Sequence, residues 1–270
     1  MEAPVYNLSE DFDPSLARLN SMEKLSAYCD SLYEDNIYSG ISKTFETAYP
    51  EIALSTIRKK FYHGYSRYDM KSNPISTIAS KFTYEGYNAI VIPDDIIKYP
   101  YAACSQQSIV TMELLKKKGF MTRKVSLKGK RKGHFCFEVY YNGMWHFYDP
   151  DMEPDLAFLD SYNRPGIAFL ANHPDILTKA YRNYPKELIL DIFQNYFYGP
   201  VNSFPAPKAR LFQKIAYFLS YTLWIFFLLA FAWMRVKYKK LKKSAAPKIE
   251  IHNFIKHSMS MQLKSLYSAQ

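Results

Sequence analysis

One uncharged segment constrains this chain more than any other feature. From Ile215 to Met234 the sequence runs for 20 residues without a charged side chain, and a helix of that length crosses the roughly 30 Å hydrocarbon core of a bilayer. Lys214 and Arg235 stand at its two ends, and aromatic residues near both ends suit the membrane interfaces. The sequence therefore predicts a single-pass membrane protein with its transmembrane helix within residues 211–236.

The basic charge of the chain is concentrated beside this segment. The whole sequence carries a formal net charge of +10. Residues 208–270 hold 12 Lys and Arg and one acidic residue, whereas residues 1–207 hold 23 Lys and Arg and 24 acidic residues. Because the excess belongs to the membrane flank and the tail, it gives no support to nucleic-acid binding. The tail, residues 237–270, begins with a cluster expected to bind anionic lipid head groups. This cluster consists of Lys237, Lys239, Lys240, Lys242 and Lys243.

Two signals disagree about the side of the membrane on which the rest of the chain lies. Basic residues after a membrane segment favour a cytoplasmic tail, which would place the preceding domain outside the cytoplasm. Residues 1–13 are acidic and polar, however, and do not resemble a secretory leader. Since some 200 residues would have to cross without a leader, we expect the domain on the cytoplasmic side. Three cysteines give no disulfide framework and fit a reducing compartment.

The residues before the membrane segment are numerous enough for one domain with an ample core. Apolar residues recur at helical spacing in Leu16–Tyr33 and in Ile41–Tyr62, which predicts a helical lobe over residues 1–70. Residues 71–198 form the core of the same domain, and a Pro-rich linker over residues 199–210 leads to the membrane.

Shorter patterns subdivide the core. Ala89–Ile92 is a candidate for a short buried strand before a proline. Near the end of the domain we expect helices over Leu156–Tyr162, Pro174–Tyr184 and Lys186–Tyr198.

Cys104 directly precedes a pattern typical of a helix, residues 105–118, which Gly119 closes. A cysteine at that position lies at the positive end of the helix dipole, where the thiolate is favoured over the thiol. Cys104 is therefore a candidate nucleophile. Taken alone, a cysteine before a helix is more often a small buried hydrophobic residue.

A β-hairpin is predicted after this helix. The strand signal His134–Tyr141 ends at Asn142-Gly143, a dipeptide that favours a tight turn, and Met144–Asp149 forms the return strand. Because side chains alternate along a strand and the two strands pair antiparallel, Asp149 should lie near His134.

Three side chains are thus expected to meet, namely the Cys104 thiol, the His134 imidazole and the Asp149 carboxylate. A carboxylate that orients the imidazole, while the other ring nitrogen faces the thiol, is the arrangement of an activated nucleophile. A histidine at the start of a strand is by itself usually structural, and an Asp-Pro after a strand is usually a turn. The order of all three around the hairpin favours a site of the catalytic type.

The other Cys and His residues have no such setting. Cys29 lies in a helical pattern and is interpreted as core, while Cys136 is either a bystander beside the site or a redox partner of the nucleophile, the bystander being favoured. His146 points away from the carboxylate by strand parity, and His63 and His173 have no partner at a metal-binding spacing. No cofactor and no metal is implied.

The residues around the trio form a longer pattern. It consists of Cys104 with its helix, the helix-Gly-x-x-x-Arg element that ends at Arg123, the strand Gly133–Tyr140, Trp145 and Asp149-Pro150. This pattern resembles the core of the transglutaminase-like superfamily and covers about 50 of the 270 residues.

Families of this type place cysteine, histidine and aspartate in that order on a papain-like α+β core. The resemblance implies an antiparallel sheet packed on the Cys-bearing helix, to which this chain adds a helical N-terminal lobe and a C-terminal transmembrane helix. It also implies Cys104 as the nucleophile, His134 as the general base and acid, and Asp149 as the orienting group.

The activity implied by this resemblance is that of a cysteine hydrolase (peptidase or amidase) or an acyltransferase. Such an enzyme acts on an amide or peptide bond of a peptide or protein through a thioester, and either water or an amine accepts the acyl group. The alternative from another class is a catalytically inactive binding or assembly module at the membrane.

Two further features bear on the candidate site. The backbone N–H of Cys104 is the natural first donor to an oxyanion, while the second donor stays open, since Tyr99 and Tyr101 are weak candidates. Residues 128–132 add four positive charges just before His134. We interpret them as a solvated hairpin tip, with attraction of an acidic or lipid-anchored substrate as the alternative.

Overall fold

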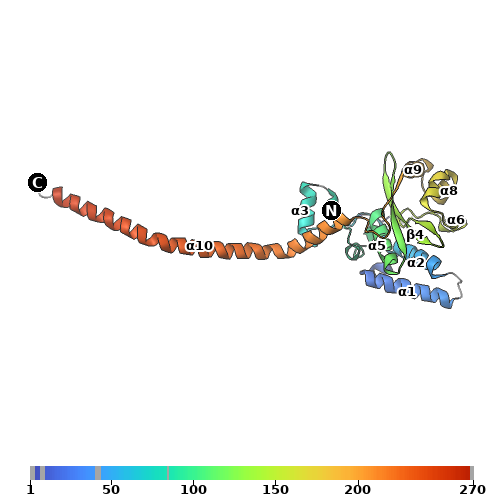
Figure 1. The fold of residues 1–270 in the computed structure, drawn as a ribbon, viewed down its shortest axis with the longest axis horizontal. Coiled ribbons are helices and arrows are strands. Elements are labelled where there is room, and N and C mark those ends of the chain that lie inside the picture. Colours follow the sequence, from blue (N-terminus) through green and yellow to red (C-terminus); the bar gives the residue numbers. More distant parts are fainter. Residues whose placement is uncertain (1–3, 7–9, 40–43, 84, 268–270) are drawn as a thin grey trace. The chain divides into compact units, whose positions relative to one another are not determined.

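The computed structural model describes residues 4–6, 10–39, 44–83 and 85–267. The chain divides into two compact units, residues 1–217 and residues 218–270. Helices surround a small antiparallel sheet in the first unit (Figure 1), so the mixed α+β class is confirmed. The papain-like character of this core stays a prediction.

The N-terminal lobe is helical. It contains the 3-10 helix η1 (Pro14–Arg18), α1 (Met22–Tyr38) and α2 (Phe45–Lys60). The side chain of Ser21 accepts a hydrogen bond from the backbone N–H of Lys24, which satisfies a free donor in the first turn of α1. Part of the predicted helix over 41–62 lies outside the described residues.

A four-stranded antiparallel sheet forms the centre of the domain, in the order β5-β4-β3-β6. Its strands are β3 (Met121–Lys128), β4 (Gly133–Tyr141), β5 (Met144–Tyr148) and β6 (Tyr196–Tyr198). Helix α5 (Cys104–Lys117) packs against β4 and β3. The predicted helix that follows residue 104 is therefore confirmed, with Cys104 as its first residue.

The predicted β-hairpin is also confirmed. Tyr141 pairs with Met144, so the loop between β4 and β5 has two residues. These are Asn142, with a φ of 48°, and Gly143, with a φ of 78°. Two successive positive φ angles define the turn that matches the twist of paired strands, and asparagine and glycine tolerate them best.

The two faces of the sheet are buried in different cores. Alternate residues of β4, including Phe137 and Val139, pack with α1, α2 and α5. Cys136, on the opposite face of β4, packs with Val125 of β3 and with the helices that follow β5. Figure 1 shows these two groups of helices on either side of the sheet. Since both faces are covered, the hairpin is fixed in position by packing on both sides.

The residues between α2 and α5 form short elements. These are β1 (Tyr62–His63), α3 (Pro74–Phe82), the 3-10 helix η2 (Glu85–Asn88), α4 (Pro93–Ile96) and β2 (Tyr101–Ala102), and β1 pairs with β2 in parallel.

The prediction of a strand over Ala89–Ile92 is wrong. Ala89 forms only an isolated bridge with Arg67. The N–H of Ile90 donates to the backbone C=O of Ser66, but side chains satisfy the next groups: the C=O of Ile90 accepts a hydrogen bond from Gln106, and the N–H of Val91 donates one to Gln213. A segment satisfied in this way needs no neighbouring strand.

The segment after the hairpin differs from its prediction in detail. It forms α6 (Leu156–Asp160), α7 (Ile167–Asn172), α8 (Pro174–Ala180) and α9 (Lys186–Ile192). Helix α7 was not predicted, and each of the other three ends earlier than expected. The helix predicted over 186–198 is wrong at its end, because residues 196–198 pair with β3 as strand β6. The three consecutive aromatic residues Tyr196–Tyr198 favour such an edge strand, because aromatic side chains are enriched in strands.

Helix α10 (Pro207–Tyr267) begins inside the segment predicted as a linker, residues 199–210. Its first turns belong to the globular unit. The side chain of Gln213 is fully buried and donates a hydrogen bond to the C=O of Ala89 at 2.6 Å. Within the described residues, one helical segment is long and apolar enough to cross a membrane, namely Pro207–Lys243, the N-terminal part of α10.

Candidate functional site

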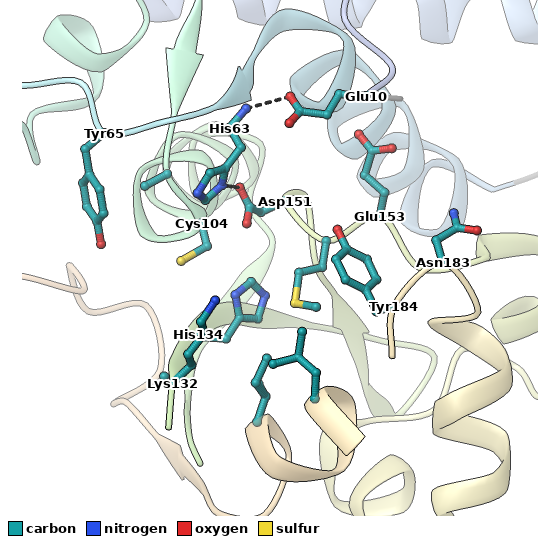
Figure 2. Close-up of a pocket in the computed structure, with 15 residues that line it drawn as sticks. Glu10, His63, Tyr65, Cys104, Lys132, His134, Asp151, Glu153, Asn183 and Tyr184 are labelled. Atoms are coloured by element: carbon teal, nitrogen blue, oxygen red, sulfur yellow. Dashed lines mark hydrogen bonds and ion pairs between the residues drawn. The ribbon is translucent and has the colours of Figure 1, made fainter. Parts of the chain in front are cut away.

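A pocket of about 870 Å³ opens where the N-terminal end of α5 meets the end of the sheet. Figure 2 shows its labelled side chains converging from segments that are far apart in the sequence. Its titratable lining residues include His63, Cys104, Lys132, His134, Asp151 and Glu153. Two of the three residues predicted to form the site, Cys104 and His134, thus line one opening.

Cys104 is the first residue of α5 and is half-buried. Ala103 precedes it in extended conformation and cannot cap the helix with its side chain. The side chain of Gln106 reaches back instead, and its Oε1 accepts a hydrogen bond from the backbone N–H of Ala103 at 3.1 Å. This contact fixes the backbone just before the thiol and leaves the sulfur at the pocket wall.

His134 and Asp149 are in contact, as predicted. Nε2 of His134 lies 2.8 Å from Oδ2 of Asp149. By the register of the hairpin, Phe137 pairs with Tyr148, so Asp149 follows the last pair and lies diagonally across from His134. Diagonal neighbours on one face of a sheet remain within reach of each other's side chains. Because Nε2 is occupied by Asp149, Nδ1 is the ring nitrogen left to face Cys104.

The carboxylate of Asp149 is completely buried and accepts hydrogen bonds on both oxygens. Oδ1 accepts the backbone N–H groups of Asp151 and Met152, each at 3.2 Å, and Oδ2 also accepts the hydroxyl of Tyr181 at 2.8 Å. Burial alone favours the neutral acid, but the nearby His134 and these donors outweigh it, so the pKa of Asp149 is lowered.

The protonation of His134 follows from the same pair. Burial opposes a charge on the ring, whereas the carboxylate of Asp149 and a hydrogen bond with Cys104 favour it. The attractive interactions are stronger, and the pKa of His134 is raised well above its ordinary value. The pair therefore favours an imidazolium beside a carboxylate, with the sulfur of Cys104 on the open side of the ring.

A second hydrogen-bonded pair of a histidine and a carboxylate, which the sequence did not predict, faces this site. Nδ1 of His63 lies 2.8 Å from Oδ1 of Asp151, and Nε2 of Gln107 donates to the same oxygen at 3.0 Å. The hydrogen bond to Asp151 raises the pKa of His63, although burial opposes the charge. The pairing of β1 with β2 carries His63 to the pocket, and no local pattern in the sequence signals that pairing.

The donor atoms of three residues lie close together at this point. Sγ of Cys104, a ring nitrogen of His134 and a carboxylate oxygen of Asp151 are all within 4.8 Å of one another. Figure 2 shows these three side chains pointing to the same part of the pocket. The site thus contains a thiol, an imidazole and a carboxylate in addition to the buried Asp149.

The other cysteines and histidines singled out in the sequence lie elsewhere. Cys29 is fully buried in the core, as predicted. Cys136 is fully buried in the second core, and burial raises the pKa of its thiol well above its usual range, which favours the bystander interpretation. His146 binds the backbone oxygens of Arg164 and Tyr141, and His173 binds that of Phe169.

Charged side chains of both signs line the remaining wall. Lys132 comes from the basic loop before β4, and Glu153 forms an ion pair with Arg58 at 3.3 Å. The loop is held by Asp191, whose carboxylate accepts the backbone N–H groups of Lys130 and Arg131. Lys132 thus lines the pocket, while Lys128, Lys130 and Arg131 are exposed, as expected of a solvated tip.

Comparison of the chain with protein-family models, with curated proteins and with solved structures finds no match. A function can therefore be inferred only from the geometry of the site itself.

Proposed function

We propose that the protein is a membrane-tethered thiol enzyme that cleaves or transfers an amide or peptide acyl group through a thioester at Cys104. The observation that carries this proposal is the contact of His134 with the buried Asp149 at 2.8 Å, with Cys104 on the other side of the ring. A structural histidine would need neither a buried carboxylate nor an adjacent thiol at the mouth of a pocket.

The reaction follows from these positions. Nδ1 of His134 holds the proton given up by Cys104, and the sulfur attacks the carbonyl carbon of the amide as the thiolate. The backbone N–H of Cys104, at the N-terminal end of α5, is aimed at the oxyanion that forms. His134 then gives the proton to the leaving amine while the C–N bond breaks. Water or a second amine attacks the thioester and releases Cys104 as a thiol.

Asp149 acts as the orienting group in this mechanism. Its Oδ2 holds Nε2 of His134, so that Nδ1 faces the sulfur of Cys104, and its charge stabilises the imidazolium. Two backbone N–H groups and Tyr181 keep the carboxylate in place. The pocket of about 870 Å³ is large enough for a segment of peptide.

The membrane assignment belongs to the same proposal. The apolar part of α10 would cross the bilayer once, and the five lysines from Lys237 to Lys243 would bind anionic head groups beside it. The catalytic domain is expected on the cytoplasmic side. If the helix spans the bilayer, alkaline carbonate leaves the protein in the membrane pellet, whereas release into the supernatant contradicts the tether.

Active-site labelling tests the chemistry. The full-length protein in detergent is treated with iodoacetamide at a low molar excess, and the modified cysteine is identified by mass spectrometry. Rapid alkylation of Cys104 is expected, while Cys29 and Cys136 serve as internal controls, because both are fully buried. Alkylation of Cys104 no faster than that of a free thiol peptide at the same pH would contradict an activated nucleophile.

Acyl transfer is tested with 4-nitrophenyl acetate. We expect a burst of nitrophenolate close to the enzyme concentration and an acetyl group on Cys104, since deacylation of the thioester is a separate step. Cys104→Ala should abolish the burst, and Cys136→Ala should keep it. A burst that persists in Cys104→Ala, or none in the wild type, would overturn the proposal.

A further inference from the structure

The site contains more ligand atoms than the proposed acyl transfer uses. Asp151 takes no part in that mechanism, yet its carboxylate lies within 4.8 Å of both the sulfur of Cys104 and a ring nitrogen of His134. The side chain of Asp151 is only 7% exposed. Its carboxylate therefore adds a third type of metal-ligating group at the point where the thiol and the imidazole already meet.

We propose that Cys104, His134 and Asp151 form a reversible Zn²⁺ site whose occupation blocks the thiol. Thiolate, imidazole and carboxylate are all zinc ligands, and three protein ligands with one open position are typical of zinc sites that face a cavity. The mixed set with one sulfur and one nitrogen disfavours Mg²⁺ and Ca²⁺, which take oxygen ligands.

The spacing of the donor atoms fits such a site. With metal–ligand distances of about 2.0 to 2.3 Å, neighbouring ligands of a tetrahedral zinc lie roughly 3.3 to 3.7 Å apart. The three donors here are within 4.8 Å of one another, so small side-chain rotations would complete the coordination. The fourth position would point into the pocket and bind water.

The surrounding hydrogen bonds also suit a metal. Nε2 of His134 is held by Asp149 at 2.8 Å, which leaves Nδ1 as the ligand atom and orients the ring. Oδ1 of Asp151 is held by His63 at 2.8 Å and by Gln107 at 3.0 Å, which leaves its other oxygen for the metal. Outer hydrogen bonds of this kind orient metal ligands in known zinc sites.

The consequence for the thiol is direct. On binding, Nδ1 of His134 releases to solvent the proton that it holds from Cys104, so that the thiolate forms an S–Zn bond and the lone pair of Nδ1 forms an N–Zn bond. Neither the nucleophile nor the base is then available. The amide-cleaving form is therefore the metal-free protein, and Zn²⁺ holds it inactive until a competing ligand removes the ion.

The experiment uses the full-length protein in detergent after treatment with a chelator. Co²⁺ serves as the spectroscopic probe and Zn²⁺ as the competitor. We expect a thiolate-to-cobalt charge-transfer band in the near ultraviolet with the intense visible bands of tetrahedral cobalt, and Zn²⁺ should displace both. Zn²⁺ should also protect Cys104 from iodoacetamide, and removal of the ion should restore alkylation.

Variants assign the ligands. Cys104→Ser should abolish the charge-transfer band, and Asp151→Asn should weaken Zn²⁺ binding at least about ten-fold, the loss that even outer-sphere changes produce. Glu153→Gln is the matched control, because Glu153 lines the same pocket but is not among the three grouped donors. It should bind Zn²⁺ as the wild type does.

Two results would overturn the proposal. One is the absence of a charge-transfer band at millimolar Co²⁺, and the other is equal Zn²⁺ affinity in Asp151→Asn and Glu153→Gln. Both are distinct from a failure of the proposed enzymatic function, which is measured by alkylation and acylation of the metal-free protein.

Discussion

The hydroxyl of Tyr181 donates a hydrogen bond of 2.8 Å to Oδ2 of Asp149, the same oxygen that contacts Nε2 of His134. All three side chains are buried. Tyr181 lies just after α8, so the helices behind the sheet take part in holding the carboxylate. The candidate site is therefore tied to both cores of the domain rather than built only on the hairpin.

Removal of this hydroxyl should destabilise the domain. Tyr181→Phe leaves a buried carboxylate with one donor fewer, and we expect a loss of about 1 to 3 kcal/mol in the free energy of unfolding. Urea denaturation of the full-length protein in detergent measures it. Tyr184→Phe is a control on a pocket tyrosine and should change stability by less than about 0.5 kcal/mol. Equal effects of the two substitutions would contradict the role given to Tyr181.

Gln106 is expected to be the most sensitive polar residue near the thiol. Its side chain makes four hydrogen bonds to backbone groups of Ser66, Ile90 and Ala103, and it is fully buried. Gln106→Leu removes the side-chain partner of the N–H groups of Ser66 and Ala103 and of the C=O of Ile90, whereas the C=O of Ser66 still accepts the N–H of Ile90. The free energy of unfolding should therefore fall by about 3 to 5 kcal/mol.

The exchange of backbone amide hydrogens provides the local measurement for this variant. Faster exchange is expected at Ser66 and Ala103, the two residues whose N–H groups bind Oε1 of Gln106. The exposed Gln194 allows a matched control, and Gln194→Leu should leave stability within about 0.5 kcal/mol of the wild type. Wild-type exchange at both amides in Gln106→Leu would show that Gln106 is dispensable.

The attachment of α10 to the domain should depend on Gln213. Its Oε1 accepts the backbone N–H of Val91 at 3.0 Å, and its Nε2 donates to the C=O of Ala89 at 2.6 Å. Gln213→Leu should therefore speed amide exchange at Val91 and cost about 1 to 3 kcal/mol. The neighbouring Lys214 is exposed, so Lys214→Gln should not alter this exchange. Slow exchange at Val91 in both variants is the outcome that contradicts the attachment.

Lys60 should give the stability of the domain a pH dependence in the alkaline range. The side chain is 2% exposed, and burial lowers its pKa from 10.5 to about 8. Between these values the unfolded chain binds more protons than the folded one, so the free energy of unfolding rises with pH from about 8 to about 10.5. Below pH 8 the full cost of burying the charge is present.

Lys60→Met tests this dependence. At pH 7 the variant should be more stable than the wild type by about 1 to 3 kcal/mol, because removal of the buried charge outweighs the lost hydrogen bond from Nζ of Lys60 to the C=O of Tyr99. The difference should shrink as the pH rises above 8. Denaturation at several pH values measures it, and a difference that is constant with pH would show that Lys60 does not titrate as expected.

Local patterns in the sequence predicted the parts of the site that lie on regular elements. Helix α5 and the hairpin of β4 and β5 were predicted because helical periodicity, strand alternation and the Asn142-Gly143 turn act over a few residues. The same patterns placed Asp149 beside His134. They failed where tertiary contacts compete with local preference, as at Tyr196–Tyr198, which joins the sheet instead of extending a helix.

The sequence by itself determined the apolar run of α10, the Cys-bearing helix and the hairpin with its histidine and aspartate, because each depends on the spacing of neighbouring residues. Only the tertiary structure decided that His63 and Asp151 join the pocket, that Tyr181 holds Asp149 and that Gln106 and Gln213 satisfy distant backbone groups. Such contacts join residues far apart in the chain by single hydrogen bonds. They leave no periodic pattern, because they form only when packing brings the segments together.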